Sequence, residues 1–441
     1  MQRMQTLLGH LGPTTNRSLL DAAGTNISLH TTAAGGSSVG VGAAPRLMVE
    51  RGDDVVVVSA LRTPIGKAKR GSFKDTRADD LLAAALKGVL KETKIPPQLV
   101  GDIVVGNCLA PGGGAFLARV AQFFSGIPET VPVNTVNRQC SSGLQAFMNM
   151  AGGIRNGAFD IGIAAGVESM SQGDRGAARE DLNPKIFLSQ VTKDCLIPMG
   201  ITSENVAEQF GITREQQDLM GLQSQEKAAR AKRLGLFKDE IIPVTTTITD
   251  KDGNEREITV SEDDGIRPTT KEGLAKLRPA FKKGGTTTAG TSSQVSDGAA
   301  AVIGMKRSVA NQMGLPVLGV LVSFAVVGVP PAVMGIGPAF AIPEALKKAG
   351  LSIDDIDVFE INEAFASQAT YCVKKLGIPM EKVNPLGGAI ALGHPLGCTG
   401  ARQIGTLLHE LKRRGKPAYG VVSMCIGTGM GAAAVFYHPG K

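Results

Sequence analysis

The stretch Thr135-Val-Asn-Arg-Gln-Cys-Ser-Ser-Gly143 links an extended segment to a helix that we expect to run to about Asn156. It is followed by Phe159 to Gly166, an apolar run typical of a buried strand. Strand, helix and strand in this succession indicate an α/β fold. In such folds the loops at strand ends form the functional sites, and Cys140 lies in one of these loops.

A similar succession recurs near the C-terminus. Val383-Asn384 opens a glycine-rich turn that contains His394, and a helix is expected from about Thr399 to Arg414. Phe159 to Ser169 therefore parallels Tyr419 to Gly429, although a repeat this weak could also arise by chance. Two related halves would place their strand-end loops at one shared seam.

The segment between the two halves has a different texture. Glu204 to Lys232 is charged and helical in pattern, and Ile241 to Val260 alternates as a hairpin does, with Asp252-Gly253 as its turn. The predicted boundaries are an N-terminal segment at residues 1–50, a first half at 51–170 completed by about 292–316, an inserted loop domain at 171–291 and a second half at 317–441.

The composition excludes several classes of protein. The 441 residues include no Trp and only 3 Tyr, and 47 Lys and Arg against 40 Asp and Glu give a net charge of +7. No long basic run occurs, so a nucleic-acid partner is not expected, whereas a mild positive field suits anionic small molecules. The six cysteines form no CxxC pair and the five histidines do not cluster, so neither a disulfide framework nor a metal site is predicted. The uncharged stretch 418–436 holds four glycines and indicates a buried strand and turn rather than a membrane span.

The first 50 residues have the composition of a targeting segment. Residues 31–45 are rich in Ala, Gly and Ser, as flexible linkers are, and positions 4, 7, 8 and 11 form an apolar helical stripe. Three interpretations stay open: a frayed helix without a role, a mitochondrial presequence, and a segment that resembles the type-2 peroxisomal targeting signal, read through Arg3, His10 and Leu11.

Cys140 is the first candidate for chemistry. It lies at the expected start of a helix, where backbone N–H groups and the helix dipole stabilise an anion. We therefore expect the pKa of its thiol to fall from about 8.5 toward roughly 7, which favours the nucleophilic thiolate. The alternative is an inert buried thiol, the commoner state of an arbitrary cysteine.

Three further loops carry residues suited to the same chemistry. His394, in a turn dense with glycine, is either a base or a satisfied core histidine. Cys425 ends a strand and Gly427 offers a free N–H to an oxyanion, although a glycine-rich strand crossing has the same pattern. Asn362 either caps a helix expected from Glu363 to Leu376 or holds a water or a substrate oxygen.

Together these motifs resemble those of the thiolase family, and in particular its peroxisomal 3-ketoacyl-CoA branch. Four motifs stand in the family's order between about Asp53 and Gly440: Asn-Arg-Gln-Cys-Ser-Ser-Gly, Asn-Glu-Ala-Phe, Gly-His-Pro-Leu-Gly and Cys-Ile-Gly-Thr-Gly. The resemblance implies a thiolase fold, with two similar five-stranded αβαβα halves plus a loop domain, assembled as dimers or tetramers. It favours a homodimer in the peroxisomal matrix, with the mitochondrial matrix as the less favoured alternative.

The resemblance also implies a mechanism. Cys140 is the nucleophile that accepts the acyl group, His394 takes its proton, and Cys425 protonates the acetyl-CoA enolate when a 3-ketoacyl-CoA is cleaved. CoA then removes an acyl chain two carbons shorter, which is the last step of fatty-acid β-oxidation. One oxyanion site would be His394 with a water held by Asn362, and the other the N–H groups of Cys140 and Gly427.

The expected partners follow from the same resemblance. CoA is a co-substrate, and neither a permanently bound cofactor nor a metal is required. By this resemblance Ser293 is expected to contact its pantetheine arm and Met199 the acyl tunnel, while Phe365 ends the Asn-Glu-Ala-Phe motif and is expected to contact the substrate. Arg267, in the insertion with Lys residues nearby, is either a contact for the anionic phosphates or a solvated surface side chain. The type-2 receptor would read Arg3, His10 and Leu11.

Two alternatives remain open. A biosynthetic condensing enzyme shares the fold, although such enzymes pair the cysteine with two histidines, or with His and Asn, rather than with a Cys-Ile-Gly motif. A non-catalytic acyl-CoA-binding or thiol-redox protein would use the same cysteines differently, for example in a disulfide between Cys140 and Cys195.

Overall fold

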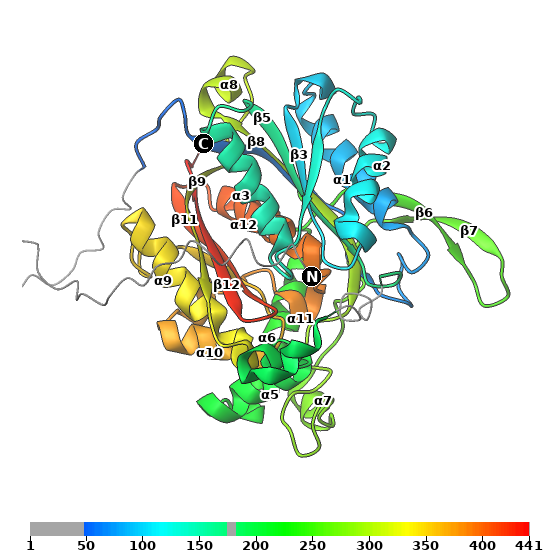
Figure 1. Cartoon of the computed structure of the whole chain (residues 1–441), viewed down its shortest axis with the longest axis vertical. Helices are drawn as coiled ribbons and strands as arrows, with labels where there is room; N and C mark the ends of the chain where they lie inside the picture. Colours follow the sequence, from blue (N-terminus) through cyan, green and yellow to red (C-terminus); the bar gives the residue numbers. More distant parts are fainter. Residues whose placement is uncertain (1–47, 174–181, 441) are drawn as a thin grey trace, which may run out of the picture. The chain divides into compact units, whose positions relative to one another are not determined.

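The computed structural model describes residues 48–173 and 182–440. Its main sheet has the strand order β10-β11-β12-β9-β1-β8-β5-β3-β4, with a short β2 paired to β8 (Figure 1). The strand bounds are β1 Val55–Arg62, β2 Gly66–Lys67, β3 Asp102–Gly106, β4 Val133–Val136, β5 Ile161–Ser169, β8 Ser296–Lys306, β9 Gly319–Gly328, β10 Val358–Ile361, β11 Ala418–Ile426 and β12 Met430–His438.

The strands divide into two sets with the same connectivity. In the first set β3 lies parallel to β4 and β5, and β8 pairs antiparallel with β5 and β1. In the second set β10 lies parallel to β11, and β12 pairs antiparallel with β11 and β9. Val383 takes the place of β4 there through a single parallel bridge to Phe359 of β10. The repeat expected from the sequence is confirmed, because its two stretches form β5 and β11.

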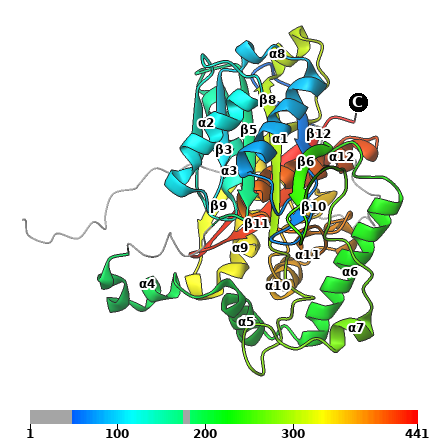
Figure 2. The ribbon, with the colours of Figure 1, turned by 90° about the vertical axis from the view of Figure 1, so that its right-hand side faces the viewer.

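Helices cover the outer faces of both sets (Figures 1 and 2). α1 (Ala78–Thr93) packs on β8, β5 and β1 with α2 (Ala115–Phe124) beside it. α9 (Gly337–Ala349) packs on β9, β12 and β11 with α10 (Ala366–Leu376) beside it. The apolar strand residues that point outward are buried under these helices.

Two helices lie between the sets, side by side. α3 (Ser142–Arg155) packs on β5 and β3, and α12 (Leu396–Arg413) packs on strands of both sets. The rings of Phe147 in α3 and Phe436 in β12 lie 5.4 Å apart and close the apolar space between the sets. The result is five layers in the order helix, sheet, helix, sheet, helix, as expected for the fold.

Glycines let the two inner helices approach each other closely. A Cβ added at Gly400 would lie 2.2 Å from the backbone nitrogen of Leu144, and one at Gly143 would lie 2.6 Å from the carbonyl oxygen of Gly397. Real Cβ atoms do not approach backbone this closely, so larger side chains are excluded at both positions. Since α3 begins after Cys140 and α12 after His394, this contact brings the two turns together.

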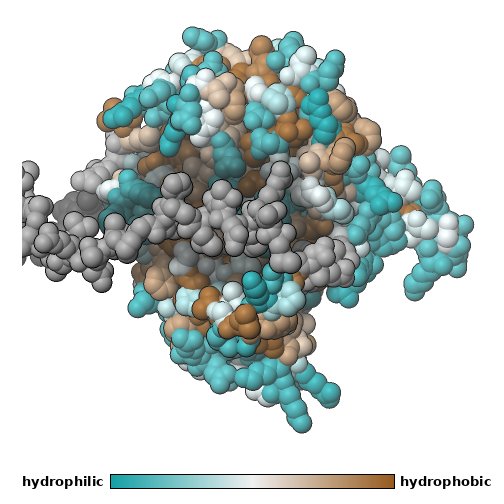
Figure 3. Space-filling view, viewed as in Figure 1, coloured by the Kyte–Doolittle hydropathy of each residue, from teal (hydrophilic) through white to brown (hydrophobic). Residues whose placement is uncertain are grey.

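The inserted segment contributes most of the remaining elements. They are α4 Gln190–Asp194, α5 Met199–Phe210, α6 Arg214–Arg233, β6 Val244–Thr249, β7 Glu255–Val260 and α7 Lys271–Ala275, with α8 Arg307–Gln312 and α11 Ala389–Leu392 elsewhere in the chain. The hairpin β6–β7 projects at the right of Figure 1, and its surface is largely hydrophilic in Figure 3.

Two boundaries differ from the sequence expectation. The single helix predicted over 204–232 is two helices, because Gly211 adopts a left-handed φ of 64° and ends α5. The helix predicted from Glu363 begins at Ala366 instead. The proposed signal residues Arg3, His10 and Leu11 lie outside the described residues, so their interpretation stays a prediction. No helix within residues 48–173 and 182–440 is long and apolar enough to cross a membrane.

Candidate active site

Cys140 stands on a tight turn between β4 and α3. Gln139, just before it, adopts a left-handed φ of 48°, which is uncommon for a residue with a side chain. The Ser142 hydroxyl supports the turn, because it accepts a hydrogen bond from the Arg138 N–H (2.9 Å) and donates one to the Gln139 carbonyl (2.6 Å). The turn therefore holds the thiol at the start of the helix, as the sequence predicted.

The expected low pKa of Cys140 is wrong for this structure. Burial raises the pKa of the thiol to about 11, although the N–H groups of Gly427 and of Cys140 itself act in the opposite direction. Desolvation of a thiolate therefore outweighs the stabilisation by donors at the helix start. The side chain keeps 9% of its surface exposed, so it remains at the edge of the interior. A resting thiol here needs a base before it can act as a nucleophile.

His394 lies between α11 and α12 and is held at both ring nitrogens. Nδ1 lies 2.6 Å from the hydroxyl of Thr399, and Nε2 lies 3.3 Å from Nδ2 of Asn362. The Thr399 hydroxyl donates to the Pro395 carbonyl (3.4 Å), so it accepts from Nδ1–H, and Nε2 accepts from the Asn362 amide. This assignment makes the ring neutral, with its basic nitrogen on the side of Asn362.

Asn362 follows β10 and is fully buried. The interpretation as a helix cap is wrong, because the capping position of α10 belongs to Phe365. The Oδ1 atom of Asn362 has no hydrogen-bond partner among the described residues. A buried amide oxygen without a partner favours a water or a substrate group at this position.

Cys425 lies near the end of β11 with no exposed surface. Its thiol donates to Oε1 of Gln368, 3.5 Å away. Burial raises the pKa of Cys425 well above its ordinary value, and the neighbouring Cys140 raises it further. A neutral thiol of this kind can give a proton to a stronger base such as a carbanion.

Two further expected residues join this cluster, Met199, predicted to line the acyl tunnel, and Phe365, predicted to contact the substrate. Met199 and Phe365 pack against Met334, Ala364 and Cys425. A Cβ added at Gly427 would lie 3.8 Å from the sulfur of Met199 and 3.8 Å from Cγ of Gln139. The turn of Cys140, the strand end at Gly427 and the start of α5 therefore meet at one place.

The other expected CoA contacts are placed less closely. Ser293 is tied to the site by its N–H, which donates to the Ala364 carbonyl (3.0 Å). Arg267 is half-buried, and its N–H donates to the side chain of Gln225 (3.0 Å). The structure thus joins Ser293 to the site, and the contact of Arg267 with the phosphates stays a prediction.

Several residues of the site escaped the sequence reasoning. Thr399 orients His394, and Gln368 holds Cys425. Phe281 is 43% exposed and meets the ring of Phe365 edge-on at 5.9 Å. Glu168 is a charged residue at the end of an apolar strand, and that contrast was a signal that could have been used.

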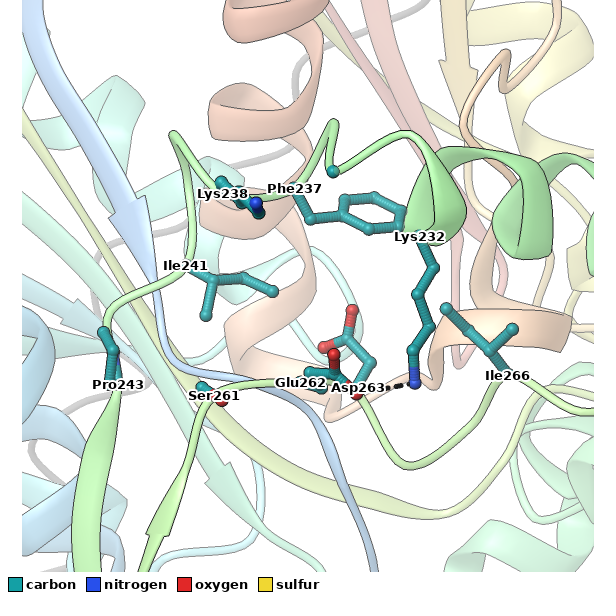
Figure 4. A pocket seen from close by; sticks show the side chains of 10 residues that line it. Lys232, Phe237, Lys238, Ile241, Pro243, Ser261, Glu262, Asp263 and Ile266 are labelled. Atoms are coloured by element: carbon teal, nitrogen blue, oxygen red, sulfur yellow. Dashed lines mark ion pairs between the residues drawn. The ribbon is translucent and has the colours of Figure 1, made fainter.

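A half-open pocket among the described residues is lined by other side chains. Its volume is about 260 Å³, and Figure 4 shows it between the end of α6 and the segment after β7, beside the Lys232–Glu262 ion pair. None of the candidate catalytic residues lines it. Among the described residues no group of His, Cys, Asp and Glu is arranged to hold a metal ion.

Both halves of the chain match models of a known protein family. Residues 55–308 match the thiolase N-terminal domain, and residues 315–438 match the thiolase C-terminal domain. The chain is 63% identical to 3-ketoacyl-CoA thiolase A, peroxisomal, of Rattus norvegicus over 443 residues, which span 100% of this chain and 98% of the rat protein. It is 62% identical to the Homo sapiens 3-ketoacyl-CoA thiolase, peroxisomal, over 442 residues and 100% of both chains.

Solved structures agree with the sequence matches. The dimeric peroxisomal thiolase of Saccharomyces cerevisiae superposes with a TM-score of 0.81 at 51% identity, over 88% of this chain and 98% of the yeast chain. A second yeast thiolase structure, described as five-layered and constructed from two core domains of identical topology, gives 0.73 at 47% identity, over 89% and 100%. In sequence along its whole length and in the connectivity of both halves, the chain belongs to the thiolase family.

Proposed function

We propose that the protein is a 3-ketoacyl-CoA thiolase, an acyltransferase that cleaves 3-ketoacyl-CoA with CoA to acetyl-CoA and an acyl-CoA two carbons shorter. The observation that supports this most is the setting of Cys140, whose sulfur receives the Gly427 N–H and lies near Cys425. His394 and Asn362 provide a base and a polar cradle in the second half. Relatives of the same length at 62–63% identity are named for this activity.

The first half-reaction uses both sulfurs. His394 Nε2 takes the Cys140 proton, and the thiolate attacks the ketone carbon of the substrate. The bond between the α and β carbons breaks, which leaves an acyl thioester on Cys140 and the enolate of acetyl-CoA. Cys425 gives its proton to the enolate carbon, because its buried thiol is neutral.

The second half-reaction returns the enzyme to its starting state. The Cys425 thiolate takes the proton of CoA, whose sulfur attacks the thioester carbon, and Cys140 leaves as thiolate and regains its proton from His394. The N–H groups of Cys140 and Gly427 stabilise one developing oxyanion, and His394 with a water at Asn362 stabilises the other. Ser293, Met199 and Phe365 would hold the pantetheine and acyl parts, and Arg267 the phosphates. CoA acts as co-substrate, and none of these steps needs a metal.

The same proposal includes assembly and location. We assign the protein to the peroxisomal matrix, with import through Arg3, His10 and Leu11, since the relatives are named peroxisomal. A homodimer fits the yeast structure described as dimeric. In such a homodimer the second copy would cover the apolar face of α2, next to the edge strand β4. Phe116 on this face is 91% exposed and Phe124 is 52% exposed.

The proposal is tested by a cleavage assay across 3-ketoacyl-CoA chain lengths with free CoA. We expect acetyl-CoA and the shortened acyl-CoA from at least one length, and loss of product by several orders of magnitude in Cys140→Ala. Cys195→Ala is the matched control, since Cys195 lies in the insertion and is expected to leave the rate unchanged. A purified, folded wild type that forms no acetyl-CoA from any length would contradict the proposal.

A further inference from the structure

Glu168 is a buried carboxylate that no step of the proposed reaction uses. It lies near the end of β5 and is 3% exposed. Its Oε2 accepts the N–H of Cys108 (3.0 Å) and of Gly397 (2.9 Å), and its Oε1 accepts the N–H of Leu109 (3.0 Å). The carboxylate therefore joins backbone from the first half to the second turn of the site.

The hydrogen bonds from Cys108 and Leu109 connect Glu168 to the Cys140 turn. Cys108 and Leu109 follow β3, and their backbone is fixed by Glu168. The Cys108 thiol in turn donates to the Gln139 carbonyl at 2.7 Å, directly before Cys140. Movement of Glu168 would thus be transmitted to the nucleophile through one side chain and one peptide unit.

The hydrogen bond from Gly397 connects Glu168 to the His394 turn. Gly397 lies three residues after His394, in the first turn of α12. This turn is pressed into the first half, because a Cβ at Gly397 would lie 2.5 Å from Cα of Asn107, and one at Gly166 would lie 2.2 Å from the Gly397 carbonyl. Glu168 supplies the hydrogen bond that fixes the orientation of this close contact.

We propose that Glu168 is a positioning residue for the thiolase reaction, a two-armed clamp that sets the His394 turn of the second half against the Cys140 turn of the first. The inference rests on the proposed function and deepens it. Near-attack geometry is sensitive to shifts of about 1 Å, which cost on the order of 100-fold in rate. A clamp that spans the two halves has this effect without touching the substrate.

The charge of Glu168 adds a second consequence. Among the described residues it has no lysine or arginine partner; burial raises the pKa of its carboxyl, and the three backbone N–H groups, with the start of α12, act against this shift. Its negative charge raises the pKa of Cys140, beyond the larger effect of burial. The clamp thereby helps to keep Cys140 a thiol until His394 takes the proton.

Two variants separate the geometry of the clamp from its charge. Glu168→Gln keeps the size and removes the charge, whereas Glu168→Asp keeps the charge and shortens the reach by one methylene. We expect both to lower kcat by about 10- to 100-fold with KM for the acyl-CoA within about twofold of wild type. The pH profile of Cys140 alkylation by iodoacetamide, followed by peptide mass spectrometry without substrate, should move to lower pH in Glu168→Gln only.

Glu204→Gln is the matched control. Glu204 is also buried and bound by backbone N–H groups, of Thr286 and Thr287 at 2.9 Å, but it lies on α5 and has no contact with either turn. We expect this variant to lose stability and to keep the wild-type alkylation profile, because a purely structural carboxylate does not act on the Cys140 charge.

The outcomes are distinguishable from failure of the proposed function. If the wild type cleaves no 3-ketoacyl-CoA, the proposed function fails, and the alkylation profiles still test the effect on Cys140. If the wild type is active and Glu168→Gln shows wild-type kcat, the inference is overturned. If Glu168→Gln does not fold, Glu168→Asp carries the test, and a wild-type kcat there overturns the inference equally.

Discussion

At the scale of a residue, the neighbours of His394 determine which of its two ring nitrogens carries the proton. Thr399 accepts from one ring nitrogen and Asn362 donates to the other, so the basic nitrogen is the one on the side of Asn362. Cys425 shows the opposite arrangement, a thiol kept neutral by burial and held by Gln368. In the proposed mechanism the base His394 and the acid Cys425 thus differ because their surroundings favour different protonation states.

Asn362→Ala tests the proposed role of the Asn362 amide, which contacts His394 and is expected to hold a water. We expect kcat to fall by about 100- to 1,000-fold, as for the loss of an oxyanion donor, because both the contact to His394 and the water site disappear. The melting temperature should also fall, since the fully buried side chain leaves a cavity and His394 Nε2 loses its donor, but a loss of stability alone does not change kcat of the folded enzyme. Steady-state kinetics and thermal unfolding of the same preparation check this, and a kcat within threefold of wild type would show that the amide takes no part.

Glu360 supplies a prediction on pH. Burial raises its pKa to about 8, although Arg402 at 3.2 Å acts against this shift. The folded state therefore binds the Glu360 proton more tightly than the unfolded state does, which contributes to the free energy of unfolding. This contribution is complete below about pH 4.5 and is lost as the pH rises through about 8. Glu360→Gln, which cannot ionise, should therefore gain stability relative to wild type between pH 5 and 8.5. Urea unfolding of both proteins at several pH values measures the difference, and a difference independent of pH would refute the shift.

At the residue scale the sequence nominates candidate site residues but does not give their pKa values. Cys140, His394, Cys425 and Asn362 stand in motifs that a single chain displays. The direction of the Cys140 pKa shift was wrong, because the helix start is visible in a sequence and the degree of burial is not. The Thr399 and Gln368 contacts depend on side-chain directions set by packing, and no spacing rule predicts them.

At the scale of elements, the crossing of α3 and α12 decides whether the two turns meet. Gly143 and Gly400 allow the helices to touch through backbone. The sequence predicted both helices, with starts within three residues of the observed ones. Their contact could not be predicted, since a glycine in a helix signals close approach without naming the partner.

Gly400→Ala tests this crossing. We expect a loss of about 1–3 kcal/mol in the free energy of unfolding, because the new Cβ would lie 2.2 Å from the Leu144 nitrogen and must separate the helices. The kcat should fall as well, since Cys140 and His394 move apart. Gly152→Ala on α3 is the control, because nothing lies within 4 Å of its Cβ, and a gain of about 0.5–1 kcal/mol is expected. Equal stability of the two variants would contradict the account.

The boundary between α5 and α6 is marked by local signals in the sequence. Thr213 and Gln216 form a capping box at the start of α6, and Gly211 ends α5 in a left-handed conformation. Both signals are local and can be recognised in a sequence. The late start of α10 had no such signal, because Asn362 and Glu363 are used for tertiary contacts in the site.

At the scale of the whole molecule, the repeat in sequence becomes a repeat in topology. Strands β5 and β11 have equivalent neighbours in their two sets, and their ends lie beside the inner helices. The α/β class was predictable from the alternation of strands and helices, whereas the two five-stranded halves were expected from the resemblance to thiolases and only weakly indicated by the repeat. The edge of the second set was not predictable, because Val383 pairs with β10 through a single bridge where the first set has the strand β4.

The exposed face of α2 leads to a prediction on assembly. Figure 3 shows apolar surface where α2 lies, and a second copy would cover it. Phe124→Glu should weaken the dimer, because charge in an apolar interface is costly to desolvate. Phe340→Glu on α9, at a similar exposure of 47%, is the control and should stay dimeric. Sedimentation velocity over a concentration series compares them, and an unchanged dimer in Phe124→Glu would place the interface elsewhere.

The central claim is that Cys140 carries the acyl group while His394 and Cys425 handle protons around it. Incubation with a 3-ketoacyl-CoA in the absence of free CoA, followed by rapid acid quench and peptide mass spectrometry, tests this most directly. We predict the mass of the shortened acyl chain on the peptide that contains Cys140, and its disappearance within one turnover after CoA is added. Acetyl-CoA production with Cys140 unmodified throughout, or an acyl group found only on Cys425, would contradict it.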